Sequence, residues 1–158
     1  MKRLFVTPSL CIGCRTCELA CSFAHTDRES LMPGKSRINV FAFTPEINVP
    51  IVCLQCDTPA CGYACPSGAL TRNRETGAIE LIKDKCVMCH NCVAACPFGN
   101  LMVPPKSKVP VKCDLCGGDP MCAKFCPTKA LQFSEVQPSI PAKEEIIPEE
   151  ALTTKFSF

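Results

Sequence analysis

At residues 86–97 the chain reads CVMCHNCVAACP, four cysteines at spacings x2, x2 and x3 with a proline directly after the last. Three similar groups accompany this stretch, and none of the sixteen cysteines lies outside a group. The four groups are Cys11, Cys14, Cys17 and Cys21; Cys53, Cys56, Cys61 and Cys65; Cys86, Cys89, Cys92 and Cys96; and Cys113, Cys116, Cys122 and Cys126. The fold must therefore be organised around these thiols.

The spacing at residues 86–97 is that of bacterial ferredoxins, in which three thiolates hold one iron–sulfur cluster and the fourth reaches a different one. Sixteen thiolates are enough for four 4Fe–4S clusters. The sequence therefore predicts four such clusters as cofactors, with all sixteen cysteines as ligands. A chain of 158 residues built around four clusters would serve as a conduit for electrons.

Disulfide bonds and structural zinc are two other uses of cysteine that a cysteine-rich chain suggests. A secreted disulfide scaffold has a similar cysteine content, but sulfurs two residues apart are poor disulfide partners, and residues 1–8 are too short and too polar for a signal peptide. Structural zinc also uses Cys-x2-Cys pairs. Zinc does not require a third cysteine at x2 or a fourth at x3 before proline, so iron–sulfur clusters remain the prediction.

Composition indicates that the clusters themselves replace part of the core. Without the cysteines the apolar fraction falls from 47% to roughly 37%, below the usual 45–50%. We therefore expect the apo chain to be largely unfolded. The formal charge of +2 also drops, to about −6, once each cluster with its thiolates contributes about −2. The scattered basic residues predict no nucleic-acid partner, and no stretch is long and apolar enough to span a membrane.

The segments between the groups predict small antiparallel sheets. Residues 66–86 indicate a strand, a turn at residues 75–77 and a second strand. A strand after the fourth group, near residue 131, would pair with residues 3–6. Residues 37–43 alternate as a further strand, and residues 97–112 are a proline-rich linker.

Within each group the third and fourth cysteines are expected on a short helix, as at Cys92 and Cys96. The proline after the fourth cysteine stops the helix and swings that sulfur toward a neighbouring cluster. Group one has Ser22 instead of proline, so its helix can continue through His25, as far as Leu31.

The four groups together resemble the four-cluster electron-transfer subunits of the dimethyl-sulfoxide-reductase and formate-dehydrogenase type. CIGC at 11–14, KCDLC at 112–116 and CPTKAL at 126–131 are similar to signatures of that family, and the resemblance covers residues 3–133. Shorter relatives serve hydrogenases, carbon monoxide dehydrogenases and tungsten aldehyde oxidoreductases. CRTCELACSFAH at 14–25 looks most like the small subunit of the last.

This resemblance implies an α+β fold of two nested bacterial-ferredoxin-like modules. The four-cluster core would span residues 1–135, with an outer module of about 1–35 plus 108–135 and an inner module of about 49–104. Residues 136–158 would form an extended tail that binds a partner. The implied ligand sets are Cys11/Cys14/Cys17/Cys126, Cys113/Cys116/Cys122/Cys21, Cys53/Cys56/Cys61/Cys96 and Cys86/Cys89/Cys92/Cys65.

Residues other than cysteine are expected to have structural or electrostatic roles and no catalytic role. His90 is assigned a surface or hydrogen-bonding role, and His25 a contact with the loop of the next module. Most charged residues beside the cysteines are expected to be solvated, although some can adjust cluster potentials: Arg15, Glu18, Asp57, Lys85, Lys112, Asp114, Asp119, Lys124 and Lys129. The chain shows no acid–base pair, nucleophile–base pair or nucleotide motif, so we expect no catalytic residues.

The leading hypothesis is a non-catalytic subunit of a cytoplasmic oxidoreductase complex in anaerobic metabolism. It would join a catalytic subunit, of tungsten or molybdenum aldehyde or formate type or a hydrogenase or carbon monoxide dehydrogenase, to a flavoprotein or ferredoxin, as part of a hetero-oligomer. The alternatives are a free soluble polyferredoxin and a filament-forming electron wire.

Overall fold

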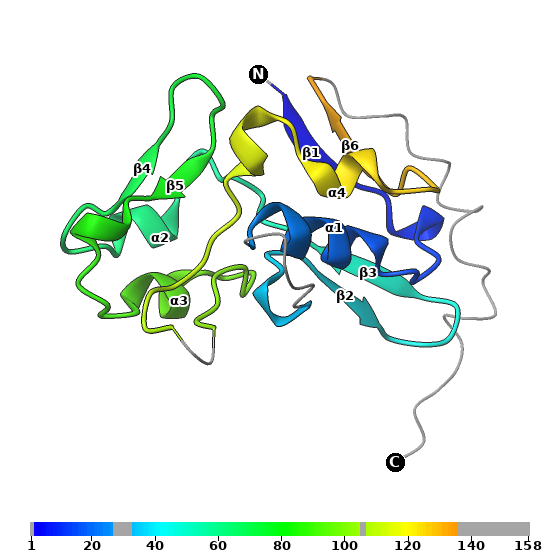
Figure 1. Ribbon diagram of the computed structural model, residues 1–158, viewed down its shortest axis with the longest axis horizontal. Helices are drawn as coiled ribbons and strands as arrows, with labels where there is room; N and C mark the ends of the chain where they lie inside the picture. Colours follow the sequence, from blue (N-terminus) through cyan, green and yellow to red (C-terminus); the bar gives the residue numbers. More distant parts are fainter. Residues whose placement is uncertain (1, 27–32, 105–106, 136–158) are drawn as a thin grey trace, which may run out of the picture.

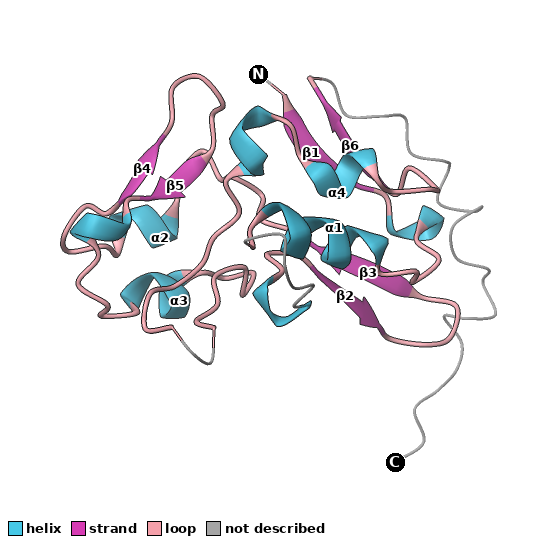
Figure 2. Cartoon of the chain, viewed as in Figure 1, coloured by secondary structure: helices cyan, strands magenta, loops and turns pink. Residues whose placement is uncertain are grey.

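The computed structural model describes residues 2–26, 33–104 and 107–135, in which short elements alternate with long loops (Figures 1 and 2). The strands are β1 (Arg3–Val6), β2 (Asn39–Ala42), β3 (Asn48–Ile51), β4 (Leu70–Arg72), β5 (Ile79–Leu81) and β6 (Leu131–Ser134). The α-helices are α1 (Thr16–Ala24), α2 (Ala60–Tyr63), α3 (Asn91–Ala95) and α4 (Met121–Lys124). Four 3-10 turns are η1 (Pro8–Leu10), η2 (Pro33–Lys35), η3 (Lys83–Lys85) and η4 (Leu115–Gly118). The predicted tail lies outside the described residues.

Three two-stranded antiparallel sheets connect these elements. β1 pairs with β6, with Leu4 opposite Phe133 and Val6 opposite Leu131, so the predicted pairing between the two ends of the cysteine-containing region is confirmed. β4 pairs with β5 around a turn in which the Asn73 side chain accepts from the backbone N–H groups of Glu75 and Thr76. This confirms the hairpin predicted after Pro66.

The described chain forms two lobes (Figure 1). In the outer lobe, α1 packs against α4 beside the β1–β6 sheet. In the inner lobe, α2 packs against α3 beside the β4–β5 hairpin. The segment of the inner lobe lies within the sequence of the outer lobe, so the architecture is α+β with small sheets and short helices, as expected.

A third hairpin, β2–β3, packs on the outer lobe. The alternating residues 37–43 predicted β2, but its partner β3 was not predicted. Pro50 lies in the middle of β3, and proline argues against a strand because it lacks an N–H donor. It is tolerated because, within the described residues, β3 pairs with β2 alone.

The expectation that the third and fourth cysteines share a helix is wrong in groups two, three and four, where α2, α3 and α4 end before the fourth cysteine. α3 ends at Ala95, and because proline follows Cys96, that cysteine has extended dihedral angles (φ −78°, ψ 111°). α1 ends at Ala24, with the His25 N–H donating to the Ser22 carbonyl. The extension that the missing proline allowed stops there, and residues 27–32 are outside the described part.

Cysteines make up a large part of the buried core. The outer core combines Leu4, Leu115 and Leu131 with the thiols of Cys17, Cys21, Cys122 and Cys126. The inner core combines Leu70, Ile79 and Leu101 with Cys61 and Cys92. The apolar side chains are few, in keeping with a core completed by something bound to the thiols.

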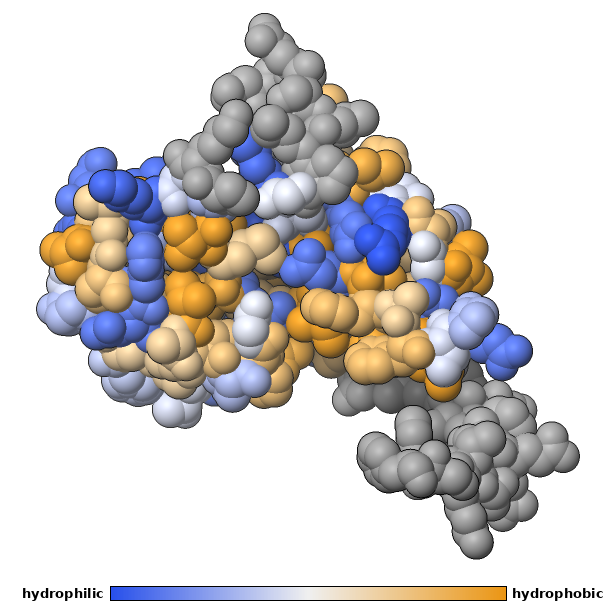
Figure 3. Space-filling view, turned by 90° about the horizontal axis from the view of Figure 1, so that it is seen from below, coloured by the Kyte–Doolittle hydropathy of each residue, from blue (hydrophilic) through white to orange (hydrophobic). Residues whose placement is uncertain are grey.

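Apolar residues also gather on the surface of both lobes (Figure 3). Large apolar side chains that are more than half exposed are Ile12, Phe41, Phe43, Tyr63, Val87 and Phe125. Among the described residues no helix combines the length and apolar character needed to cross a membrane.

Candidate metal centres

One local design recurs in all four cysteine groups. The third cysteine is always the second residue of an α-helix: Cys17 in α1, Cys61 in α2, Cys92 in α3 and Cys122 in α4. The first two cysteines of each group precede the helix, in a loop except for Cys116, which lies in the 3-10 turn η4. The helix thus presents its first turn, where backbone N–H groups lack partners, beside the thiols.

The loop before each helix curls in the same way. The residue before the second cysteine has a positive φ in every group: Gly13 (70°), Gln55 (49°), Met88 (59°) and Leu115 (55°). Only one of these four is glycine, and a positive φ costs other residues roughly 1–2 kcal/mol. Strained backbone that recurs at equivalent positions marks a functional site, and left-handed residues in loops aim successive N–H groups into a concave nest for negative charge.

The fourth cysteine accepts a backbone N–H in three of the groups. The donors are Arg37 to Cys21 (3.3 Å), Ala69 to Cys65 (3.2 Å) and Asn100 to Cys96 (3.4 Å). Three residues after Cys65, Cys96 and Cys126 the backbone again has positive φ, at Gly68, Gly99 and Lys129. This turn follows the three groups that carry the proline and is absent after Cys21, where α1 continues.

Four cysteines from two different groups line a cavity in the outer lobe. They are Cys11, Cys14, Cys17 and Cys126, and the cavity measures about 20 Å³. Val40 of β2 and Pro50 of β3 cover it. The carboxylate of Glu18 is buried beside it and accepts the Val40 N–H at 2.6 Å. The β2–β3 hairpin is thus fastened over these thiols by one hydrogen bond to α1.

A larger cavity, of about 180 Å³, lies in the inner lobe. Its four thiols are Cys53, Cys56, Cys61 and Cys96, again from two groups. Ile79 and the buried side chain of Lys112 also line it. A space of this size holds a group much larger than one metal ion, since a water molecule takes up about 30 Å³ in the liquid.

The remaining eight thiols line neither of these cavities: Cys21, Cys65, Cys86, Cys89, Cys92, Cys113, Cys116 and Cys122. Burial and then the nearby thiols of Cys113, Cys21 and Cys116 raise the pKa of Cys122 well above its ordinary value. In the inner lobe, Cys65 packs beside Cys92. Cys86 is half-buried and Cys89 exposed. No disulfide joins any of the sixteen cysteines, all of which lie in described ranges.

Thiols of different cysteine groups are close enough for their charges to affect one another's pKa. The charge of Cys17 contributes to the raised pKa of Cys122, after burial and the closer thiols. Burial raises the pKa of Cys113 to about 12, with smaller contributions from Cys53 and Cys21. Burial also raises the pKa of Cys92, with smaller contributions from Cys65 and Cys61.

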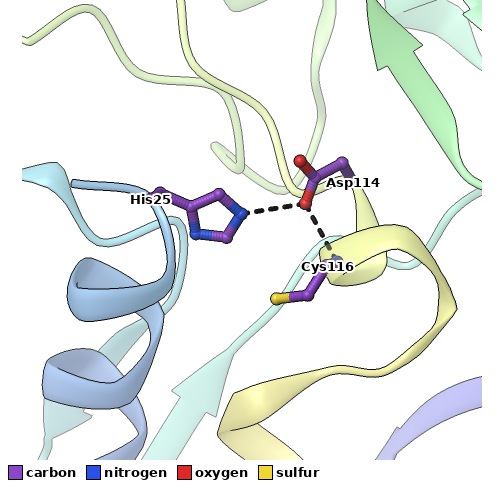
Figure 4. Close-up of side chains that lie close together, drawn as sticks. All are labelled: His25, Asp114 and Cys116. Atoms are coloured by element: carbon purple, nitrogen blue, oxygen red, sulfur yellow. Dashed lines mark hydrogen bonds and ion pairs between the residues drawn. The ribbon is translucent and has the colours of Figure 1, made fainter. Parts of the chain in front are cut away.

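His25 joins α1 to the loop of the fourth group (Figure 4). Its Nδ1 lies 2.8 Å from the Cys21 carbonyl and its Nε2 lies 3.0 Å from Asp114 Oδ1. The same carboxylate accepts the Cys116 N–H at 3.0 Å and pairs with Arg37 at 2.6 Å. The hydrogen bond that the His25 imidazole donates to the Asp114 carboxylate, and its interactions with the Cys116 and Cys21 side chains, raise the pKa of His25 to about 12. His25 contacts the next loop, as expected.

This network explains the one group of mixed metal-ligating side chains in the described residues, His25, Asp114 and Cys116, whose ligand atoms lie within 4.8 Å of one another. Although burial opposes its ionisation, hydrogen bonds from His25 and Arg37 hold the pKa of Asp114 well below its usual range. With its carboxylate already paired, the group is a structural tie. His90 has the expected hydrogen-bonding role, with Nε2 2.7 Å from the Lys108 carbonyl.

Three polar residues, Glu18, Gln55 and Lys112, are buried, which the sequence did not predict. Glu18 and Lys112, expected to be largely solvated, are 8% and 5% exposed. Gln55 was not singled out at all, yet it is 7% exposed and bonds to two distant segments. Their positions beside cysteines were visible in the sequence, but their burial depends on contacts with segments more than 20 residues away.

Comparison with known proteins places this geometry among iron–sulfur proteins. Residues 45–136 match the family model described as a 4Fe-4S dicluster domain. The polyferredoxin-like subunit of an aliphatic sulfonate oxidoreductase from Pyrococcus furiosus is 43% identical over 123 residues, which cover 78% of this chain and 70% of that protein. The putative electron transport protein YsaA of Escherichia coli is 39% identical over 151 residues, 87% and 92% of the two chains.

A solved structure has a similar fold. A chain of the active site complex BamBC of benzoyl coenzyme A reductase superposes with a TM-score of 0.52 at 28% identity, covering 99% of this chain and 91% of that one.

Proposed function

The chain belongs to the 4Fe–4S dicluster domain family of iron–sulfur electron-transfer proteins, and we propose that it relays electrons through four 4Fe–4S clusters within an oxidoreductase complex. In this role it is non-catalytic, as its relatives named for electron transport indicate. Its proposed partners are a catalytic subunit, with tungsten or molybdenum, and a flavoprotein or ferredoxin.

The chemistry of the donors fits the clusters. Two cavities are each lined by four thiols, and neither lining contains a histidine or a carboxylate. Soft sulfur ligands are those that iron–sulfur clusters take. The helix first turns and the left-handed loop residues direct N–H groups toward negative charge, which a cluster with four thiolates carries. A bound 4Fe–4S cluster supplies a centre that gains and loses an electron.

The two four-thiol cavities are the observation that carries the proposal. With the ligand sets proposed below, the neighbouring thiols order the sets from the Cys11 set through the Cys113 and Cys53 sets to the Cys86 set. Cys14 and Cys89 are exposed, and they belong to the first and last sets in that order. The Cys113 and Cys53 sets lie between them; four of those eight thiols are buried and none is exposed. A path with shielded middle sites and an accessible site at each end can contact one partner at each end.

We further propose the four ligand sets implied by the family resemblance, with the fourth cysteine of each group exchanged between groups one and four and between groups two and three. The two lobes would then be two nested ferredoxin-like modules. Residues 136–158 are proposed as a partner-binding arm.

Relatives support a partner that performs the chemistry. One is named as a subunit of a sulfonate oxidoreductase, and the similar solved structure is part of an active site complex. By analogy, this chain would carry electrons to or from a separate catalytic subunit, which determines the substrate.

The deciding experiment is metal analysis of a tagged chain isolated without oxygen from its native host. About sixteen irons per chain, four for each cluster, with stoichiometric tungsten or molybdenum would support the proposal. Sixteen irons without a second metal or a co-purifying subunit would favour a free carrier instead. Zinc in place of iron would overturn the assignment.

A further inference from the structure

Lys112 places an ammonium group inside the protein at the junction of the two lobes. Its side chain is 5% exposed, which is unusual because a lysine is almost never fully buried unless it is paired. Nζ lies 3.2 Å from Cys53 Sγ, 3.0 Å from Gln55 Oε1 and 3.3 Å from the Cys113 carbonyl oxygen. No carboxylate is among these partners, so the thiol sulfur is the group that can provide the balancing negative charge.

Gln55 holds this ammonium group in place. Its Oε1 accepts both Lys112 Nζ and the N–H of Ile79 at 2.9 Å, and its Nε2 donates to the Cys113 carbonyl at 2.9 Å. The residue keeps a left-handed backbone, with φ of 49°, although it has a full side chain. Three hydrogen bonds to two separate segments, residues 112–113 and Ile79, fix the glutamine and compensate for that strain.

The two cysteines that Lys112 touches come from groups two and four. Under the proposed ligand sets, Cys53 and Cys113 hold two different clusters, the middle pair of the path. The charge of Lys112 also acts beyond these contacts: burial raises the pKa of Cys61, and Lys112 opposes that rise. Lys112 Nζ contacts the sulfur of Cys53 but only the backbone carbonyl of Cys113, so its charge acts most directly on the Cys53 set.

Resting on the function proposed above, we propose that Lys112 is a positioning residue that raises the reduction potential of the cluster held by Cys53, Cys56, Cys61 and Cys96. A cluster becomes more negative when it is reduced, so a nearby cation stabilises the reduced form. Because the ammonium is buried, water and salt screen its charge less than that of a surface lysine. Hydrogen bonding and charge at the ligand sulfurs are established ways to shift such potentials.

The test is a redox titration of the full-length holoprotein, followed by electron paramagnetic resonance, for wild type, Lys112→Met, Lys112→Arg and Lys85→Met. Lys85 is the matched control, because it also directly precedes the first cysteine of a group but is exposed. In Lys112→Met we expect the reduction equilibrium constant of one transition to fall at least tenfold, about 59 mV for one electron. Lys112→Arg should restore most of this shift, and Lys85→Met should leave all transitions in place.

Iron content separates the possible failures. If wild-type protein lacks the iron of four clusters, the proposed function fails. If wild type holds that iron but no transition moves in Lys112→Met, the inference about Lys112 is wrong and the function stands. If Lys112→Met does not retain iron, Lys112→Gln decides, because the amide removes the charge but can still donate a hydrogen bond. A downward shift in Lys112→Gln supports the inference, and unchanged potentials overturn it.

Discussion

Glu18→Ala should release the β2–β3 hairpin from the cavity it covers. In the native chain the Glu18 carboxylate accepts the N–H of Val40, and both residues are buried. Losing an acceptor leaves that N–H unsatisfied, at a cost of about 1–3 kcal/mol. Glu18 also lies in the first turn of α1, where a negative charge contributes about 0.3–1 kcal/mol. Only the lost hydrogen bond acts on the hairpin, and its cost of about 1–3 kcal/mol corresponds to roughly a 5- to 140-fold increase in opening of the hairpin.

Hydrogen–deuterium exchange read by mass spectrometry measures this opening directly. In Glu18→Ala, peptides covering residues 39–51 should exchange faster by about that factor, while peptides of the inner lobe should not change. Because Val40 and Pro50 line the cavity with Cys11, Cys14, Cys17 and Cys126, a chelator should also remove about a quarter of the iron faster than the rest.

Glu18→Gln is the matched control, since its amide oxygen can still accept the Val40 N–H. It should lose about 1 kcal/mol and exchange at a rate between those of wild type and the alanine variant. Exchange at residues 39–51 that is equal in wild type and Glu18→Ala would refute the reasoning. Equal effects of alanine and glutamine would show that the charge matters and the hydrogen bond does not.

Other predictions follow from the cores and the titrating groups. Ile79 is 2% exposed and packs beside Cys61 and Cys92, so Ile79→Ala should destabilise holoprotein by about 2–5 kcal/mol in denaturant titrations. Ile12 is 66% exposed, so Ile12→Ala should cost less than about 0.5 kcal/mol. Equal costs for the two variants would contradict the packing of Ile79. Asp114→Asn should destabilise holoprotein by about 1–3 kcal/mol. The pKa of His25 is raised to about 12, so its contribution to stability is full below about pH 6.5 and declines as the pH rises toward 12. The pKa of Asp114 is lowered, so its contribution to stability declines as the pH falls below about 3.9. The difference between the two proteins should therefore be largest between about pH 4 and 6.5, and a difference independent of pH would count against the ion pair. Removal of iron by a chelator should abolish the dispersed tertiary signals in near-ultraviolet circular dichroism, since the cores are rich in thiols; an apo chain that keeps them would have a sufficient apolar core.

The sequence predicted those parts of the fold that depend on local chemistry. Proline after Cys96 predicted the helix end, and the turn residues after Arg72 predicted the β4–β5 hairpin. The pairing of β1 with β6 followed from the repeat, because the end of the fourth group needs a strand partner. β3 was missed because Pro50 contradicts a strand in any local interpretation, and only pairing with β2 shows why it is allowed.

The sequence predicts which residues are the cluster ligands, and this stays a prediction; it does not predict the residues that surround them. The spacing of the sixteen cysteines identifies them in the sequence. The left-handed conformation of Gln55, Met88 and Leu115 cannot be identified in this way, because none of these residues is glycine. The burial of Lys112 arises when groups two and four meet, 59 residues apart from Cys53 to Lys112. No local pattern carries that information.

The cysteine loop repeats four times, but each copy has different neighbouring residues. These differences can give the proposed sites different reduction potentials, and so give electron transfer a direction. The loops provide nearly equal ligands, so differences between sites must come from what lies against the sulfurs. A buried carboxylate, Glu18, lies beside the Cys11 set, whereas the ammonium of Lys112 lies beside the Cys53 set. The imidazole of His25 and the guanidinium of Arg37 lie beside the Cys113 set. Negative charge lowers a reduction potential and positive charge raises it. Under the proposed ligand sets, Lys112 biases the Cys53 set toward holding the electron relative to the Cys11 set, whereas the Asp114 carboxylate offsets part of the positive charge beside the Cys113 set.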